Sequence, residues 1–250
     1  MKDVANYLLV ALMLMVLSGC ASTPPRQGSP ESTIAAINLK LGMGYMQSGH
    51  FDVALEKLKK ALEYDDTLAE AHNAIAVLYE ETGETELAER HYRRAVDLAP
   101  RYGLARVNYG RFLCAHGKPA EGESQLLTAV THSQLESLEM GYTAAGVCAR
   151  MLSELERAEQ HFRKALELNP NAAGALLELA GLSHSQGRHL QARAFLERYH
   201  AQVDYSPTSL WLGVVIEEAL GDLQQRHEYA QLLLSRFAAS KEAQQLRKTE

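Results

Sequence analysis

The sequence lacks the short motifs that mark most catalytic and metal-binding sites. It contains no CxxC pair, no HExxH and no GxxxxGK phosphate loop, and Gly181-Leu-Ser-His-Ser only approximates the GxSxG nucleophile elbow. Its ten histidines form no cluster with cysteine at the spacing that metal ligands need. We therefore expect a protein that is not an enzyme, has no cofactor or metal, and takes no small-molecule substrate.

The sequence also has no excess of positive charge. Its 25 lysines and arginines are outnumbered by 31 acidic residues, which gives a net charge of −6. Arg90, Arg93 and Arg94 form a local basic cluster, but Glu86 and Glu89 lie beside them, as on an ordinary exposed helix face. Because a phosphate backbone requires a concentrated basic surface, we expect no nucleic-acid partner.

The apolar run at the N-terminus is too short to span a bilayer. It extends over ten residues, from Leu8 to Leu17, and Lys2 precedes it, as in the core of a signal peptide. The run ends in Leu17-Ser18-Gly19-Cys20, which resembles the bacterial lipobox. That resemblance implies that the signal 1–19 is removed and that lipid is attached to Cys20. The alternative is an unmodified cysteine in a plain secretory signal.

Residues 20–33 are predicted to be a lipidated, flexible tether, because they are rich in proline, serine and glycine. Ala21 and Ser22 follow the cysteine, and no aspartate is present there to mark an inner-membrane lipoprotein. We therefore expect a protein anchored by lipid to the outer membrane, on its periplasmic face, where several acyl chains give stable attachment.

Residues 69–102 contain the most regular pattern of the chain. Small and apolar residues recur there at spacings of three and four, on both sides of Gly83 and up to Pro100. The pattern predicts two antiparallel helices with one apolar face, and such a hairpin needs neighbours to bury that face. The packing positions are Ile75, Ala76, Tyr79, Ala88, Tyr92 and Ala95.

The same pattern recurs about every 34 residues along the chain, which resembles the tetratricopeptide repeat. The predicted fold is therefore all-α, a right-handed superhelical solenoid of six repeats with about twelve antiparallel helices. The repeat domain, 34–240, is followed by a predicted C-terminal tail, 241–250. The six repeats are 35–68, 69–102, 103–138, 139–172, 173–206 and 207–240.

Two cysteines remain beside Cys20, and both lie on the first helices of neighbouring repeats. Cys114 and Cys148 occupy similar places in the third and fourth repeats, so they face each other across the groove between these helices. In an oxidising compartment this placement predicts a disulfide, which stabilises the fold by about 3–4 kcal/mol. The alternative is a pair of buried, reduced thiols that pack as small apolar groups.

The first helices of stacked repeats form a concave wall, which is the usual binding surface of such proteins. In the first repeat this wall carries Leu39, Met43 and Met46, an apolar stripe suited to an apolar peptide or helix. The second repeat adds Asn73, whose amide can bond to a peptide backbone, and Val77. An alternative is that residues 30–37 fold over the stripe as a cap.

The repeats also resemble the PilF/PilW family of type IV pilus biogenesis and stability lipoproteins. The match rests on FLC at 112–114, GVCA at 146–149 and SLWLG at 209–213, which the general repeat consensus does not predict. This resemblance implies a pilotin, an outer-membrane lipoprotein that binds the pilus secretin subunit and promotes its localisation and multimerisation. It places the secretin-binding surface on the stripe formed by Leu39, Met43 and Met46.

The chain departs from the family pattern in two places. Residues 141–150 lack the acidic and amide residues expected before the second cysteine, and Gly122 replaces the usual alanine. Another possible function is that of a lipoprotein adaptor, which recruits a periplasmic protease or cell-wall enzyme. A cryptic hydrolase is the catalytic alternative.

Overall fold

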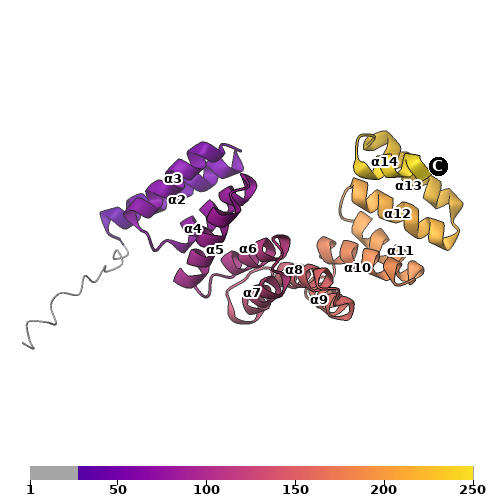
Figure 1. Ribbon diagram of the computed structural model, residues 1–250, viewed down its shortest axis with the longest axis horizontal. Coiled ribbons are helices and arrows are strands. Elements are labelled where there is room, and N and C mark those ends of the chain that lie inside the picture. The colour runs from indigo at the N-terminus through magenta and orange to yellow at the C-terminus, as the bar shows by residue number, and fades with distance from the viewer. Residues whose placement is uncertain (1–27, 250) are drawn as a thin grey trace, which may run out of the picture. The chain divides into compact units, whose positions relative to one another are not determined.

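A computed structural model describes residues 28–249 of the chain, and all of their regular secondary structure is helical. Within these residues thirteen helices form six antiparallel hairpins and one final helix. Figure 1 labels each of them along the chain. The predicted all-α fold of stacked helical repeats is confirmed. The first helices of the hairpins are α2 (Pro30–Gln47), α4 (Ala69–Glu81), α6 (Gly103–Ala115), α8 (Leu138–Met151), α10 (Ala173–Ser185) and α12 (Pro207–Leu220). The second helices are α3 (Phe51–Tyr64), α5 (Thr85–Leu98), α7 (Pro119–His132), α9 (Leu155–Leu168), α11 (His189–His200) and α13 (Leu223–Arg236), and α14 (Lys241–Thr249) ends the series.

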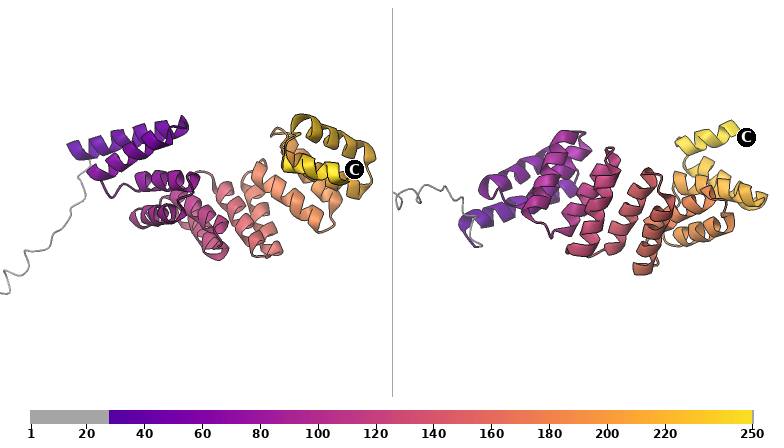
Figure 2. Two further views of the ribbon diagram at one scale, coloured as in Figure 1. Left: turned by 45° about the horizontal axis from the view of Figure 1, so that its top comes forward. Right: turned by 60° about the horizontal axis from the view of Figure 1, so that its bottom comes forward.

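The chain is organised as two compact units, Met1–Leu68 and Ala69–Glu250. The described part of the first unit is the hairpin of α2 and α3. In the second unit each hairpin packs on the next, and the second helix of one hairpin contacts the first helix of its successor. Figure 2 shows this row of helices, α4 to α14, from two sides.

Small residues allow the two helices of a hairpin to approach closely. In the fourth hairpin Gly146 of α8 faces Phe162 of α9, and a Cβ atom at position 146 would overlap the Phe162 ring. Phe162 is completely buried between α8, α9 and the following hairpin. Burying a phenylalanine side chain contributes about 1.5–3 kcal/mol to stability, so glycine here permits one of the large packing gains of the unit.

Ion pairs at a repeated position join neighbouring hairpins. Glu89 of α5 accepts hydrogen bonds of 2.8 and 2.9 Å from Lys118, which precedes α7. Glu159 of α9 makes the equivalent contact with Arg188, at 2.6 Å, which precedes α11. These hydrogen bonds hold the pKa of both carboxyl groups below their usual value. Because the pairs are partly exposed, each contributes at most about 1 kcal/mol to stability.

Two buried carboxylates form ion pairs with arginine side chains that are partly exposed. Glu123 of α7 lies 3.0 Å from both Arg157 and His161 of α9. Glu217 of α12 accepts a 3.0 Å hydrogen bond from Arg193 of α11. A buried carboxylate that loses its partner is strongly destabilising, so these contacts stabilise the junctions between neighbouring hairpins.

The two ends of the described chain differ from the sequence prediction. The predicted tail, 241–250, forms helix α14 as far as Thr249, because Ala243 and Leu246 are spaced by three residues and are buried against α12 and α13. The predicted tether, 20–33, already becomes helical at Pro30. Ser29 caps this helix by accepting a 3.1 Å hydrogen bond from the backbone N–H of Ser32.

The turn inside each hairpin requires a left-handed backbone conformation. Glycine occupies this position in five hairpins, for example Gly187, with a φ of 75°. In the fourth hairpin the position is held by Ser153, with a φ of 62°. A side chain in this conformation is strained, so the fourth turn is the least favourable of the six.

His200, the last residue of α11, lies among aromatic rings. Its ring centroid is 4.5 Å from that of Tyr205, 5.5 Å from that of Tyr199 and 5.8 Å from that of Tyr229. Both ring nitrogens are buried without a hydrogen-bond partner. Burial in these surroundings lowers the pKa of His200 to about 4, because the charged form loses its hydration.

We predict that Ser153→Gly raises the free energy of unfolding by about 0.5–1 kcal/mol. Relief of the left-handed strain contributes about 1–2 kcal/mol, and the greater freedom of glycine in the unfolded chain offsets part of it. The reverse change, Gly187→Ser, is the matched control and should lower stability by a similar amount. Chemical denaturation measures the free energy of unfolding of both variants. A Ser153→Gly variant no more stable than the natural chain would show that Ser153 is not strained.

We predict that part of the chain's acid sensitivity comes from His200. The pKa is lowered on folding, so the stabilising contribution is complete above the unfolded value of 6.5 and is lost as the pH falls towards about 4. His200→Phe should therefore flatten the decrease in melting temperature between pH 7 and pH 4.5. The exposed His227, changed to phenylalanine, serves as control and should leave the pH profile unaltered.

Candidate partner-binding surfaces

The stripe predicted on the first repeat lies along α2 in the first unit. Met43 is 47% exposed, whereas Leu39 and Met46 are partly buried towards α3. The residues that α2 buries fully include Ala35 and Gly42, which are small, so this helix leaves most of its large apolar side chains at least partly accessible. The stripe is thus an apolar, partly exposed surface with flexible thioether side chains.

Residues 30–37 are part of α2 itself and do not cover the stripe. They form its first two turns and continue in the same helix to Gln47. A segment of a continuous helix cannot fold back on the residues that follow it, so the alternative of a cap formed by residues 30–37 is wrong.

A second apolar face of α2 was not predicted from the sequence. Ile37 and Leu41 are 54% and 46% exposed, and with Gly44 and Tyr45 they line a hollow of about 380 Å³. Leu41 matches a packing position of the repeat, yet it remains exposed. The signal for this face was present in the sequence, because a first repeat has no preceding hairpin to cover that position.

The second unit contains a concave pocket of about 450 Å³ along its first helices, α4, α6 and α8. Val77 is one of its lining residues, as predicted for a groove position. Glu80, Glu81 and Arg111 give the pocket both signs of charge. The other lining residues are Tyr92, Asn108, Cys114, Ala115, Ala144, Val147, Cys148 and Met151.

Asn73 does not line this pocket directly. It is 6% exposed, and its side-chain oxygen accepts a 3.1 Å hydrogen bond from the Asn108 amide of α6. Asn108 is the amide that lines the pocket, and Asn73 fixes its orientation. Spacing within one repeat could not predict this contact, because it joins two hairpins.

A hydrogen bond holds the acidic end of the pocket in place. The hydroxyl of Tyr92 donates to Glu80 at 2.6 Å. Burial, and then the neighbouring Glu80 carboxylate, raise the pKa of Tyr92 well above its usual value, so the hydroxyl remains a donor at any physiological pH. The Glu80 carboxylate is therefore kept in one position at the rim.

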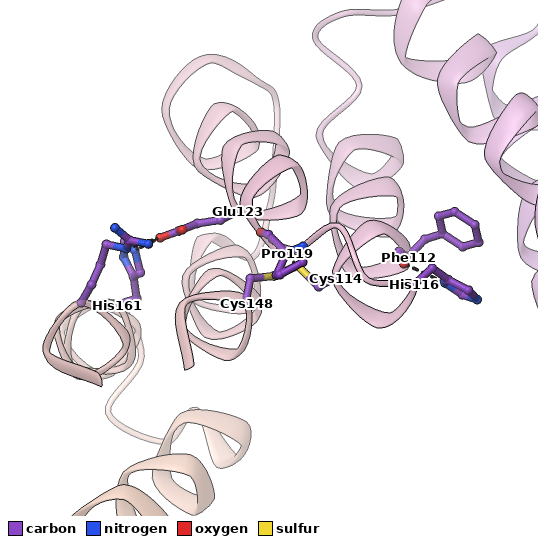
Figure 3. Close-up of a disulfide and its surroundings, with 8 residues drawn as sticks. Phe112, Cys114, His116, Pro119, Glu123, Cys148 and His161 are labelled. Carbon is purple, nitrogen blue, oxygen red and sulfur yellow. Dashed lines mark hydrogen bonds and ion pairs between the residues drawn. A yellow bond between two sulfur atoms is a disulfide. The ribbon is translucent and has the colours of Figure 1, made fainter. Parts of the chain in front are cut away.

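Cys114 and Cys148 form a disulfide in the lining of this pocket, with their Cα atoms 5.5 Å apart. The bond joins α6 to α8, as Figure 3 shows, and both cysteines are buried. It links the first helices of consecutive hairpins, which form the concave wall. The disulfide therefore cross-links this wall within the pocket lining.

Gly122, which departs from the family pattern, lies directly behind this disulfide. A Cβ atom at this position would lie 2.5 Å from the backbone oxygen of Gly110 and 3.0 Å from the backbone nitrogen of Cys114. Helices α6 and α7 therefore approach more closely than an alanine permits. This contact gives a physical reason for the exchange of alanine for glycine.

The histidines make contacts within and between hairpins. His184 and His189, which flank the fifth turn, lie with their Nδ1 atoms 3.2 Å apart, and burial and the neighbouring His189 lower the pKa of His184. His161 interacts with Glu123, as Figure 3 shows. In the part of the chain that the structure describes, no group of three or more histidine, cysteine or acidic side chains could hold a metal ion.

The predicted signal peptide and the predicted lipidation site, Cys20, lie outside the described residues. Between residues 28 and 249, no helix has the length and apolar character needed to cross a bilayer.

Comparison with known proteins agrees with the repeat architecture. One family model described as tetratricopeptide repeat matches residues 39–103 and 74–133, and another of the same description matches residues 149–204. The matched residues together make up more than half of the chain. The chain is 28% identical over 243 residues to the type IV pilus assembly protein PilF of Pseudomonas aeruginosa, covering 95% of this chain and 96% of that protein.

Two solved structures of type IV pilus proteins are similar in fold to this chain. A Pseudomonas aeruginosa PilF structure matches with a TM-score of 0.79 and 26% identity, over 89% of this chain and 100% of that one. A crystal structure of PilW, described as a widely conserved type IV pilus biogenesis factor, matches with a TM-score of 0.79 and 26% identity, over 85% of this chain and 98% of that one.

We predict that Gly122→Ala destabilises the second unit by about 1–3 kcal/mol, because the added methyl group overpacks the contact between α6 and α7. The matched control is Gly181→Ala in α10, where a Cβ atom would have no neighbour within 4 Å and where alanine favours the helix. Thermal unfolding of both variants, together with mass mapping of the disulfide, tests this. A Gly122→Ala variant as stable as the natural chain would show that the contact is not tight.

Proposed function

The chain belongs to the tetratricopeptide-repeat family, and from this membership and its homology to PilF we propose that it is a type IV pilus biogenesis protein that acts by binding. More specifically, we propose a pilotin, a lipoprotein that binds the subunit of the pilus secretin and promotes its multimerisation at the outer membrane. The observation that carries the binding role is the apolar, partly exposed α2, with Met43 at the centre of its stripe.

The physical problem that a pilotin solves is the exposed apolar surface of an unassembled channel subunit. Unpaired strand edges and apolar faces aggregate in water. A surface of leucine and methionine side chains can cover such a segment, since thioether side chains adapt to the shape of their partner. Leu39, Met43 and Met46 offer this chemistry in the first unit, and the mixed charges around Val77 and Asn108 offer polar contacts in the second.

A lipid on Cys20 would give the binding surface its location. A short tether holds the repeat domain near the bilayer and raises the effective concentration of the bound subunit where it must assemble. The lipobox of the sequence supports this part of the proposal, and so does the absence of aspartate after Cys20. The chain would therefore act at the outer membrane, facing the periplasm.

We predict that Met43→Asp abolishes secretin multimers in cells that depend on this chain for piliation. A carboxylate placed in an apolar interface loses its hydration, so binding of the secretin subunit should weaken by roughly 100-fold or more. Gel analysis of unboiled outer membranes detects the multimers. Because Met43 is half exposed, the fold should be retained, which circular dichroism checks.

The control is Leu223→Asp in α13, which alters a leucine that is 72% exposed in the second unit. It should leave the multimers intact. Normal multimers in the Met43→Asp strain would exclude the stripe as the binding surface. Affinity capture of the natural chain from solubilised outer membranes separates the two functional classes, because a pilotin enriches the secretin and an adaptor enriches a protease or cell-wall hydrolase.

A further inference from the structure

The second apolar face of α2, here called the end face, consists of Ile37, Leu41, Gly44 and Tyr45. Ile37 and Leu41 are among the more exposed large apolar residues of the described chain, and the hollow that they line contains one charged residue, Lys40. Gly42 packs against Leu58 of α3, and Leu41 and Met43 lie on either side of Gly42 around the helix, because successive residues are about 100° apart. It is therefore distinct from the stripe around Met43.

The repeat shows what normally covers such a face. Two periods further along the chain, the positions of Ile37, Leu41 and Gly44 are held in α6 by Ala105, Tyr109 and Phe112. All three are buried, and helix α5 of the preceding hairpin packs against α6.

An aromatic side chain of α5 contacts two of these buried residues of α6. The ring of Tyr92, in α5, stacks on Tyr109 with centroids 6.1 Å apart and lies 5.3 Å from Phe112. In α2 the position of Phe112 is held by Gly44, which has no side chain. The hollow above Gly44 is therefore open to a large side chain of a helix that would lie on α2 as α5 lies on α6.

The last hairpin of the second unit is covered by a further helix, whereas the end face of the first hairpin is exposed. Helix α14 packs on α12 and α13 through Ala243 and Leu246. Its exposed residues are polar, among them Gln244, Gln245 and Arg247. A terminal repeat needs such a polar cover to remain soluble, so an apolar end face on the first hairpin indicates a surface that is used.

The mature chain that the predicted cleavage before Cys20 would leave does not supply a suitable cover from its N-terminal segment. Residues 21–29 contain no large apolar side chain to fill the hollow. The polar surface of α14 does not complement an apolar face, which argues against head-to-tail contact with a second copy. Pairing of two α2 helices through this face would bring both Lys40 side chains to one interface, where their like charges oppose association.

We propose that the end face binds an amphipathic α-helix of the partner protein, which adds to α2 as the missing preceding helix of the solenoid. This helix inserts one large apolar or aromatic side chain above Gly44, between Ile37 and Leu41, and places a carboxylate near Lys40. The inference rests on the proposed function, because the helix belongs to the secretin subunit named there.

The test uses overlapping 20-residue peptides that cover the secretin subunit, with the purified mature chain. One peptide should bind the natural chain and gain helicity on binding, measured by fluorescence anisotropy and circular dichroism. Leu41→Glu should weaken its binding at least tenfold. Leu190→Glu is the matched control, because Leu190 is an exposed leucine in α11. This variant should bind the peptide as tightly as the natural chain does. Both variants should keep the melting temperature, because both leucines are exposed.

Several results would overturn the inference. If Leu41→Glu binds normally and Met43→Asp does not, the end face is unused while the proposed function stands. A bound peptide that gains no helicity would also exclude a docked helix. If neither the peptides nor the intact secretin subunit bind the natural chain, the proposed function fails together with the inference. A dimer in sedimentation equilibrium that Leu41→Glu dissociates would assign the face to a second copy instead.

Discussion

The structure depends on one recurring contact, in which the second helix of a hairpin covers the first helix of the next. Tyr92 between Tyr109 and Phe112 is the clearest example. In the second unit each hairpin has an apolar side that a neighbour covers, so the hairpins there stabilise one another. The ion pairs of Glu89 and Glu159 fix the same junctions from the outside. Stability, spacing and binding surfaces therefore all follow from how hairpins join.

Much of the fold could be predicted because the pattern repeats. A period near 34 residues indicates the helical hairpins, and the third and fourth repeats place Cys114 near Cys148. The errors occur where the pattern ends or where two repeats meet. Residues 241–249 look polar, yet Ala243 and Leu246 are enough to form α14.

The candidate site was predicted less completely for the same reason. Position within a repeat identifies which side chains face the groove, but it does not show which of them bond to one another. Asn73 is turned inward by Asn108, a residue of the next hairpin. Leu41 is exposed because the cover that its position usually receives would come from a preceding repeat. Both depend on contacts between hairpins, which a pattern within one hairpin does not contain.

The disulfide has a consequence for how the protein resists pulling. In a row of hairpins that contact only their neighbours, unfolding starts at an end and moves inward by one junction at a time. The bond between Cys114 and Cys148 closes a loop across one central junction, with a sequence separation of 34, so the stretch that it encloses cannot be pulled out to its full length. A chain that is anchored to a membrane at one end and pulled through a bound partner would then unfold in steps, and the part around the disulfide would extend last.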